Sequence, residues 1–198
     1  MSTNFTLITS LGNSDKPNIE QHLLGLSKED RYLRFFSALG DEQIKNYVAS
    51  MDLIEGKAFA IVSLPHGEIL GLAHVSRAEK EDDKIFAELG ISIDSKFRGR
   101  GFGKKLMDRV ISYCHTHRVN VLYMSCLREN RAMQKLARHF DLKIDVNPDE
   151  AAAELQIDSA TALSYLPKEI CFQQISLIDK VFRRNQKFLN SFLNLPNL

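Results

Sequence analysis

The sequence predicts a mixed α/β domain, in which a mostly antiparallel sheet is flanked by helices. Three strand-like segments joined by short connections span residues 58–94 and indicate an antiparallel meander. A strand, a helix and another strand then follow one another within residues 85–127. A crossover of this kind makes its two strands parallel neighbours in one sheet, so we expect the meander to be extended by one parallel pair.

The composition is that of a folded chain, with 198 residues of which 44% are hydrophobic and 26% are charged. These values exclude a disordered tail, a collagen-like fibre and a coiled coil. We expect a domain at 1–165, with its core near 31–146, and an extension at 166–198. The N-terminus lacks a basic and then apolar leader, and no long apolar stretch occurs. We therefore expect neither a secretory signal nor a transmembrane segment.

The first third of the chain is expected to be mainly helical. The expected elements are a short strand at 5–11 and helices at 18–26 and 28–39. Asp41 is typical of a helix N-cap, because its carboxylate can accept a hydrogen bond from an amide of the first turn. Ile44, Tyr47 and Val48 fall on one face of the helix that Asp41 would begin.

The rest of the chain follows the strand and helix order of the predicted sheet. The expected strands are 58–64, 69–77, 85–94 and 119–127, with edge strands at 142–146 and 152–157. The expected loops are 65–68, the charged segment 79–84 and the Gly- and Arg-rich segment 96–103. The expected helices are 104–117, 130–140 and a long C-terminal helix at 169–193.

The net charge of +1 is the sum of segments with opposite signs. Residues 141–160 hold six acidic residues against one lysine, whereas 166–198 hold five basic residues against two acidic ones. The near balance argues against a general nucleic-acid binder. The apolar stripe of the basic C-terminal helix favours packing on the domain or on a second subunit as a homodimer, with membrane-surface or nucleic-acid contact as the alternatives.

The three cysteines, Cys114, Cys126 and Cys171, are odd in number and lie in neither a CxxC nor a zinc spacing. Free thiols of this kind favour a reducing compartment, and we expect a cytoplasmic protein. His115 and His117 are two residues apart on a predicted helix, so their side chains point in different directions. We expect no metal site.

One glycine-rich loop joins a predicted strand to a predicted helix and carries most of the chemical signal. It consists of Arg98, Gly99, Arg100, Gly101, Phe102, Gly103 and Lys104. Glycines allow a sharp turn and a close approach of the backbone to a ligand. The free amides of the following helical turn, with the helix dipole, form an anion site suited to a pyrophosphate.

Several patterns compete for this loop. A dinucleotide loop requires GxGxxG, but the segment 99–103 has the spacing GxGxG, and a phosphate-binding GxxxxGK[ST] loop has the wrong spacing. A glycine-rich turn with solvated charges is the structural alternative. The remaining pattern, Arg/Gln-x-x-Gly-x-Gly/Ala, is matched by Arg98, Gly101 and Gly103.

On these residues the chain resembles the GCN5-related N-acetyltransferases, known as GNAT, from about residue 31 to residue 146. Two segments, 30–37 (DRYLRFFS) and 87–91 (AELGI), are similar to bacterial protein lysine acetyltransferase domains. The resemblance implies a sheet whose central parallel pair is splayed, with acetyl-CoA as co-substrate in the opening. The long C-terminal helix departs from the subfamily pattern.

The resemblance also assigns cofactor contacts along the chain. Ile91, Ser92 and Ile93 would line the pantetheine arm, mainly through backbone groups, and a nearby amide would polarise the thioester carbonyl. The loop 98–104 would hold the pyrophosphate. Asn130 and Met133 begin the next helix, where the family commonly turns an Asn side chain toward the cofactor. A plain helix N-cap is the alternative for Asn130.

Glu88 is the candidate general base. A free lysine with a pKa of about 10.4 is neutral only to a few parts in ten thousand at pH 7, so a carboxylate that accepts its proton is useful. The structural alternative is an outward-facing charge on a half-exposed strand. Many members of the family have a Tyr as general acid seven residues after the Asn, and Ala137 stands at that position here. Tyr123 and Cys126 are expected to be packing residues, and His74 has the alternatives of packing or facing the cleft.

The leading hypothesis is therefore an acetyl-CoA-dependent N-acetyltransferase in which an amine attacks directly in a ternary complex. The similarity of 30–37 and 87–91 favours a protein lysine as the acceptor. The alternatives are a small amine or polyamine acceptor, and a non-catalytic acyl-CoA-binding or interaction module.

Overall fold

The computed structural model describes residues 5–54, 57–64, 66–81, 84–146 and 150–157, all within one compact unit, Met1–Ala162. The predicted C-terminal helix and the dimer contact assigned to it lie outside the described residues. The helices are α1 (Lys16–Leu24), α2 (Lys28–Phe35), α3 (Asp41–Ser50), α4 (Phe102–Thr116) and α5 (Arg131–His139). The strands are β1 (Thr6–Leu11), β2 (Lys57–Ser63), β3 (Ile69–Glu81), β4 (Lys84–Ile93), β5 (Val121–Leu127), β6 (Lys143–Val146) and β7 (Glu150–Gln156).

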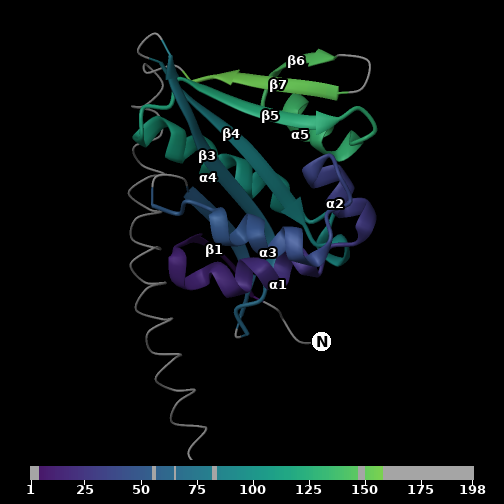
Figure 1. The fold of residues 1–198 in the computed structure, drawn as a ribbon. Coiled ribbons are helices and arrows are strands. Elements are labelled where there is room, and N and C mark those ends of the chain that lie inside the picture. The colour runs from purple at the N-terminus through teal and green to yellow at the C-terminus, as the bar shows by residue number, and fades with distance from the viewer. Residues whose placement is uncertain (1–4, 55–56, 65, 82–83, 147–149, 158–198) are drawn as a thin grey trace, which may run out of the picture. The chain divides into compact units, whose positions relative to one another are not determined.

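The strands form one seven-stranded sheet in the order β1-β2-β3-β4-β5-β7-β6 (Figure 1). The β4–β5 pair is parallel, and the other five pairings are antiparallel. The predicted fold class is therefore confirmed for the described residues. The parallel pair forms because α4 carries the chain from the end of β4 back to the start of β5.

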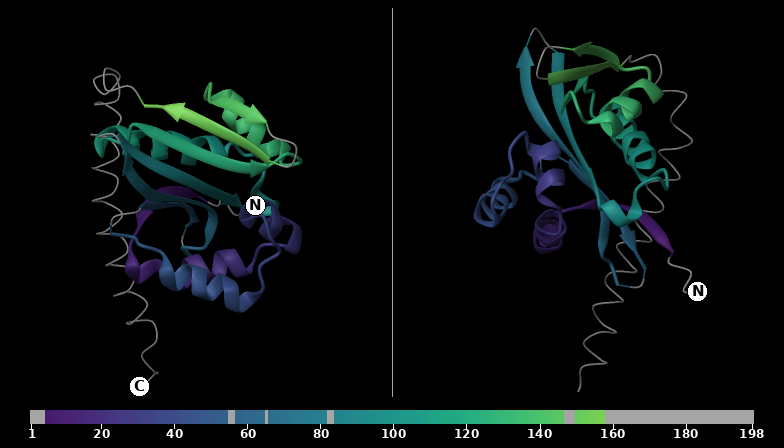
Figure 2. Two further views of the ribbon diagram at one scale, coloured as in Figure 1. Left: turned by 45° about the horizontal axis from the view of Figure 1, so that its top comes forward. Right: turned by 90° about the vertical axis from the view of Figure 1, so that its right-hand side faces the viewer.

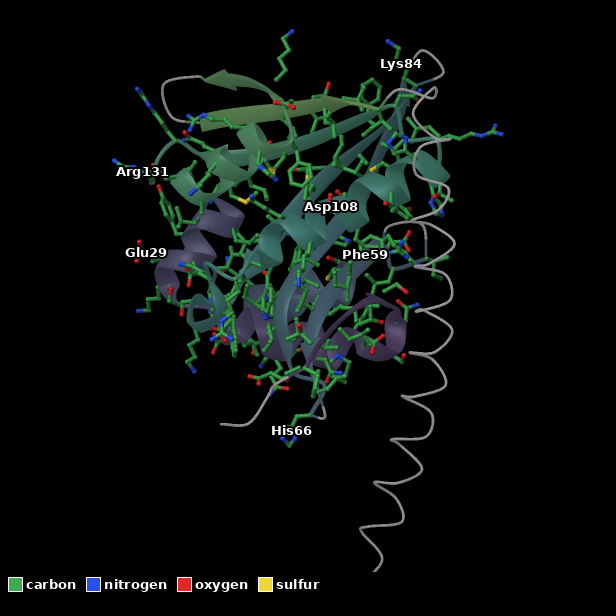
Figure 3. The ribbon with its side chains drawn as sticks, turned by 180° about the vertical axis from the view of Figure 1, so that it is seen from behind. Glu29, Phe59, His66, Lys84, Asp108 and Arg131 are labelled. Atoms are coloured by element: carbon green, nitrogen blue, oxygen red, sulfur yellow. The ribbon has the colours of Figure 1, made fainter. Side chains whose placement is uncertain are left out.

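Helices cover both faces of the sheet, with α1–α3 on one face and α4 and α5 on the other (Figure 2). On the α4 face, the ring centroids of Phe59 and Tyr113 are 5.8 Å apart, and the Arg109 guanidinium lies over the Phe59 ring (Figure 3). On the α1–α3 face, a buried cluster joins Ile19, Leu23, Ile44 and Val48 to the sheet. Side chains alternate along each strand, so neighbouring residues of β4 serve opposite faces.

Two predicted helix boundaries differ from the structure for reasons that the geometry shows. Helix α3 is capped by Gly40, whose backbone amide donates to Gln43 Oε1 at 2.8 Å, so Asp41 is the first helical residue and not the N-cap. The Asp41 carboxylate accepts instead from Arg31 Nη1 at 2.8 Å. Helix α2 ends at Phe35, before the predicted residue 39, because Phe36 is left-handed with a φ of 59°.

The charged segment 79–84 was predicted as a loop but mostly belongs to a hairpin. Lys80 pairs with Ile85 and Glu81 pairs with Lys84, beyond a register shift that follows Arg77. The backbone ladder continues because its hydrogen bonds do not depend on the polarity of the side chains. The prediction was wrong because it used side-chain polarity alone.

Two buried histidines attach the α1–α3 layer to the sheet. His22 on α1 lies 2.9 Å from both the Ile69 carbonyl and Ser92 Oγ. His74 on β3 lies 3.3 Å from the hydroxyl of Tyr47 on α3. Burial lowers the pKa of both imidazoles, and with the nearby Arg34 charge it lowers the pKa of His74 from 6.5 to about 4. Both side chains are therefore neutral at pH 7.

The depressed pKa of His74 predicts a loss of stability in mild acid. Between pH 6.5 and 4 the unfolded chain binds a proton at this residue and the folded chain does not, so the free energy of unfolding falls as the pH falls. The loss in the free energy of unfolding caused by His74 is absent above pH 6.5 and amounts to at most about 3 kcal/mol at low pH. Denaturant titrations at pH 7.5 and 4.5 should show a smaller pH-dependent loss in His74→Gln than in the wild type.

His66→Gln is the matched control, because His66 is exposed in the turn between β2 and β3 (Figure 3). It should leave the pH dependence unchanged. An equal acid loss in His74→Gln and the wild type would contradict the assignment of this effect to His74.

Candidate functional site

The glycine-rich loop requires two glycines for its backbone conformation. Gly99 and Gly101 have φ values of +75° and +76°, in the left-handed region that other residues seldom adopt. A Cβ at either position would meet no atom within 4 Å, so the requirement comes from the backbone and not from crowding. Gly103 differs, because a Cβ there would lie 3.8 Å from a methyl group of Leu136, an ordinary contact. This agrees with a pattern that tolerates Gly or Ala at the third position.

The N-terminus of α4 has no side-chain cap. Gly101 is the N-cap, and the first intrahelical bond runs from the Lys105 amide to the Gly101 carbonyl at 3.1 Å. The amides of residues 102–104 therefore lack an acceptor within the helix. By contrast, Ser27 caps α2 and Asn130 caps α5 with side-chain oxygens. The free amides and the helix dipole fit a bound phosphate group.

The cationic side chains of the loop have unequal surroundings. Arg98 forms an ion pair with Asp30 of α2, whose carboxylate side chain is 9% exposed. Arg100 lies over the Phe97 ring, 5.1 Å from its centroid, and Lys104 is exposed. Phe102 is buried, so its contribution to an anion site is its amide and not its ring. The loop thus offers backbone donors and three exposed cations, of which Arg98 is paired with Asp30.

The strands β4 and β5 part beside this loop. Their register runs only from Phe86–Val121 to Glu88–Tyr123, although β4 stays paired with β3 as far as Ile93. The Asp94 amide donates to the Leu70 carbonyl at 3.0 Å, which sets the phase of the β3–β4 ladder. Because ladder bonds alternate along an antiparallel pair, the peptide groups of Leu89, Ile91 and Ile93 face the opening.

The structure therefore separates the three strand residues predicted to contact the cofactor. Ile91 and Ile93 present backbone groups to the opening between β4 and β5, and their contact with a cofactor stays a prediction. The peptide groups of Ser92 face β3 instead, and its hydroxyl lies against His22 of α1. Ser92 thus supports the sheet and α1, whereas its neighbours line the opening.

Glu88 stands at the last paired position before the strands part. Its side chain is exposed, and within the described part of the chain it forms no hydrogen bond or ion pair. Gly90 and Ser92 contact Arg34 and His22 of the α1–α3 layer, so the alternation of β4 places Glu88 on that face too. Tyr123 is its partner on β5, is 37% exposed and stacks on Phe86. Glu88 is therefore a free carboxylate beside the opening, on the face opposite α4.

Helix α5 closes the other side of the site. The Asn130 Oδ1 accepts from the Met133 amide at 3.2 Å, and its Nδ2 donates to the Leu33 carbonyl of α2 at 3.4 Å. These bonds are those of a helix N-cap, the structural alternative for Asn130. Contact of Asn130 with a cofactor stays a prediction, and so does contact of the half-buried Met133. Ala137 is 1% exposed and faces the core, so this position supplies no proton donor.

The buried cysteines limit the nucleophiles that the described residues can supply. Cys114 and Cys126 are buried, and burial raises the pKa of both thiols, that of Cys114 to about 12. Neither is an accessible thiolate nucleophile at neutral pH. Among the described residues, no group of three or more His, Cys, Asp or Glu side chains could hold a metal ion. No helix of the described ranges is both long and apolar enough to cross a membrane.

One feature of the site has no signal in the local sequence. The guanidinium of Arg34 on α2 occupies the space in which a Cβ on Gly90 would lie. The two residues are 56 positions apart, and the contact depends on how α2 crosses β4. The sequence places Arg34 in the 30–37 segment and Gly90 in the 87–91 segment, and nothing in either segment indicates that the two residues meet.

Comparisons with known proteins agree with this geometry. A family model described as an acetyltransferase (GNAT) domain matches residues 13–143, more than half of the chain. The GNAT domain of S. lividans PAT is similar in structure, with a TM-score of 0.64 at 14% identity, covering 77% of this chain and 96% of that one.

Two further structures are similar at 18% identity and a TM-score of 0.59. Spermidine N-acetyltransferase from Vibrio cholerae, solved with CoA and spermine, covers 76% of this chain and 95% of its own. RimL, a ribosomal L7/L12 alpha-N-protein acetyltransferase solved with coenzyme A, covers 80% and 97%. Because the acetyltransferase (GNAT) domain model matches more than half of the chain, and the uncapped α4 terminus and the parted strands agree with it, the chain belongs to the GNAT family of acetyltransferases.

Proposed function

We propose that the protein acetylates a lysine side chain of a protein acceptor, by direct attack of the amine in a ternary complex. The observation that carries this proposal is the free carboxylate of Glu88 at the point where β4 and β5 part. A protein lysine is favoured by the similarity of segments 30–37 and 87–91 to bacterial protein lysine acetyltransferase domains. RimL shows that a GNAT fold of this kind serves a protein acceptor.

Acetyl-CoA supplies an activated thioester carbonyl, and the protein's own groups bind and orient it. The amides of residues 102–104 and the charges of Arg98, Arg100 and Lys104 bind the pyrophosphate. The open backbone edge at Ile91 and Ile93 pairs with the pantetheine arm as a further strand would. The opening between β4 and β5 would let the arm pass from the side of the α4 N-terminus to the α1–α3 face, where Glu88 lies.

Glu88 accepts a proton from the acceptor amine on that face. Deprotonating a lysine at pH 7 costs about 4–5 kcal/mol, which a positioned carboxylate offsets directly or through a water molecule. Ala137 provides no general acid, so the leaving thiolate takes its proton from water. Cys114 and Cys126 are free thiols, which agrees with a reducing compartment, and we propose the cytoplasm as the location.

Binding of acetyl-CoA tests the α4 N-terminus as the site of the pyrophosphate. Acetyl-CoA at a hundredfold excess over its Kd should stabilise the wild type by about 2.7 kcal/mol and raise Tm by roughly 5–10 °C in differential scanning fluorimetry. Gly101→Glu places an anion against the free amides and should abolish this increase.

Gly67→Glu is the matched control, because Gly67 also has a positive φ, +73°, and lies in the β2–β3 turn, outside the glycine-rich loop. The Gly67→Glu variant has the same backbone strain and the same added charge as Gly101→Glu, and it should keep the full ligand-induced increase in Tm. An unchanged increase in Gly101→Glu would show that the pyrophosphate does not bind here.

The pH dependence of turnover tests Glu88 as the general base. Glu88→Gln should lower kcat for a lysine peptide by about 10²–10⁴-fold at pH 7, because the base is lost and the free amine is rare. The deficit should shrink toward pH 9, since the neutral fraction of the amine rises about tenfold per pH unit below its pKa. Release of free coenzyme A measured across pH 7–9 checks both effects.

Glu29→Gln removes an exposed carboxylate from α2 and serves as the control with near wild-type rates (Figure 3). Full activity of Glu88→Gln over the whole pH range would remove Glu88 from the mechanism. Binding of acetyl-CoA without turnover of any peptide, polyamine or amino acid would instead favour a non-catalytic acyl-CoA-binding module.

A further inference from the structure

The guanidinium of Arg34 lies against the central strand, next to the proposed base. It takes the place of a side chain on Gly90, which is two residues after Glu88 and on the same face. Two residues of a strand span about 6.6 Å, so a positive and a negative side chain are presented one after the other along β4. An acceptor approaching Glu88 on this face therefore meets Arg34.

Arg34 differs from neighbouring arginines in its partners. Arg31, one turn earlier on α2, pairs with Asp41, and Arg98 pairs with Asp30. Arg34 donates to Tyr47 Oη at 3.3 Å and lies over the Phe35 ring, 4.9 Å from its centroid. Within the described ranges, it has no carboxylate partner. A half-buried guanidinium held by uncharged groups keeps its remaining N–H donors for an anion.

A second donor without an acceptor lies beside it. His74 stands directly opposite Gly90 in the β3–β4 register, is 8% exposed, and has no partner for its Nε2 atom among the described residues. Because a guanidinium only donates, the Tyr47 oxygen accepts from Arg34, and its hydroxyl is left to donate to His74 Nδ1 at 3.3 Å. A neutral imidazole bonded in this way carries its proton on Nε2, as a second unused donor.

The site thus holds one free carboxylate and, two residues along the strand, groups whose remaining unpartnered hydrogen-bonding atoms are donors. We infer that the acceptor bears a carboxylate close to the amine that is acetylated, with the amine at Glu88 and the carboxylate at Arg34. On a protein acceptor this is an acidic side chain adjacent to the target lysine. The inference rests on the proposed function, because it assigns part of the same acceptor site.

Gly90 supplies an independent way to disturb this subsite. A methyl group on Gly90 would overlap the Arg34 guanidinium, which is the mobile end of a flexible side chain, so Gly90→Ala displaces the charge without removing it. Arg34→Gln removes the charge, and Arg34→Lys keeps it without the planar pair of donors. Lys45→Gln, on the exposed surface of α3, is the control for loss of a positive charge.

The experiment measures kcat/KM for two peptides that differ only in a Glu or a Gln next to the acceptor lysine. The wild type should prefer the Glu peptide by roughly ten- to a hundredfold, the range of a hydrogen-bonded charge pair. Arg34→Gln and Gly90→Ala should bring the ratio close to one, Arg34→Lys should give an intermediate ratio, and Lys45→Gln should keep the wild-type ratio. Glu88→Gln should slow both peptides and leave the ratio unchanged.

A second matched pair, free lysine and 1,5-diaminopentane, differs only by the α-amino acid carboxylate and separates the two proposals. Peptide turnover without a preference, or a preference that survives in Arg34→Gln, overturns the inference and leaves the lysine acceptor intact. Turnover of free lysine in preference to the diamine, lost in Arg34→Gln and without peptide turnover, supports the inference and overturns the protein acceptor. Turnover of no amine overturns both.

Discussion

The parting of β4 from β5 after the Glu88–Tyr123 pair is the constraint on which the rest of the site depends. Beyond that pair, every second residue of β4 gives up its ladder bonds to β5, which among the described strands leaves peptide groups at the middle of the sheet without a strand partner. A ligand with amide groups of its own satisfies them. The same parting joins the two faces of the sheet, so a group bound at the α4 N-terminus reaches the α1–α3 face.

Helix α2 connects all parts of this opening although it has only eight residues. Asp30 pairs with Arg98 of the glycine-rich loop, the Leu33 carbonyl accepts from Asn130 at the start of α5, and Arg34 lies on Gly90 of β4. A displacement of α2 would therefore change contacts at the glycine-rich loop, at the α5 cap and at the β4 face that carries Gly90. Its sharp end at the left-handed Phe36 sets where these contacts stop.

The sequence predicted what depends on local pattern or on family resemblance. The order of elements, the parallel pair and the glycine loop follow from periodicity and from residues with special backbone preferences. The α3 cap was misassigned because Gly40 with Gln43 competed with Asp41, and Asp41 found a distant partner in Arg31. The Arg34–Gly90 contact and the unpartnered His74 nitrogen arise from tertiary packing, which no spacing along the chain encodes.

Gly90 also explains how two opposite charges coexist so closely without neutralising each other. A guanidinium free to swing along β4 would pair with Glu88 and consume the proposed base. Because Gly90 has no side chain, the guanidinium lies against the strand at that position, where it contacts the Tyr47 hydroxyl and the Phe35 ring. Glu88 stays unpaired among the described residues, and the two charges stay available for a ligand that carries both signs.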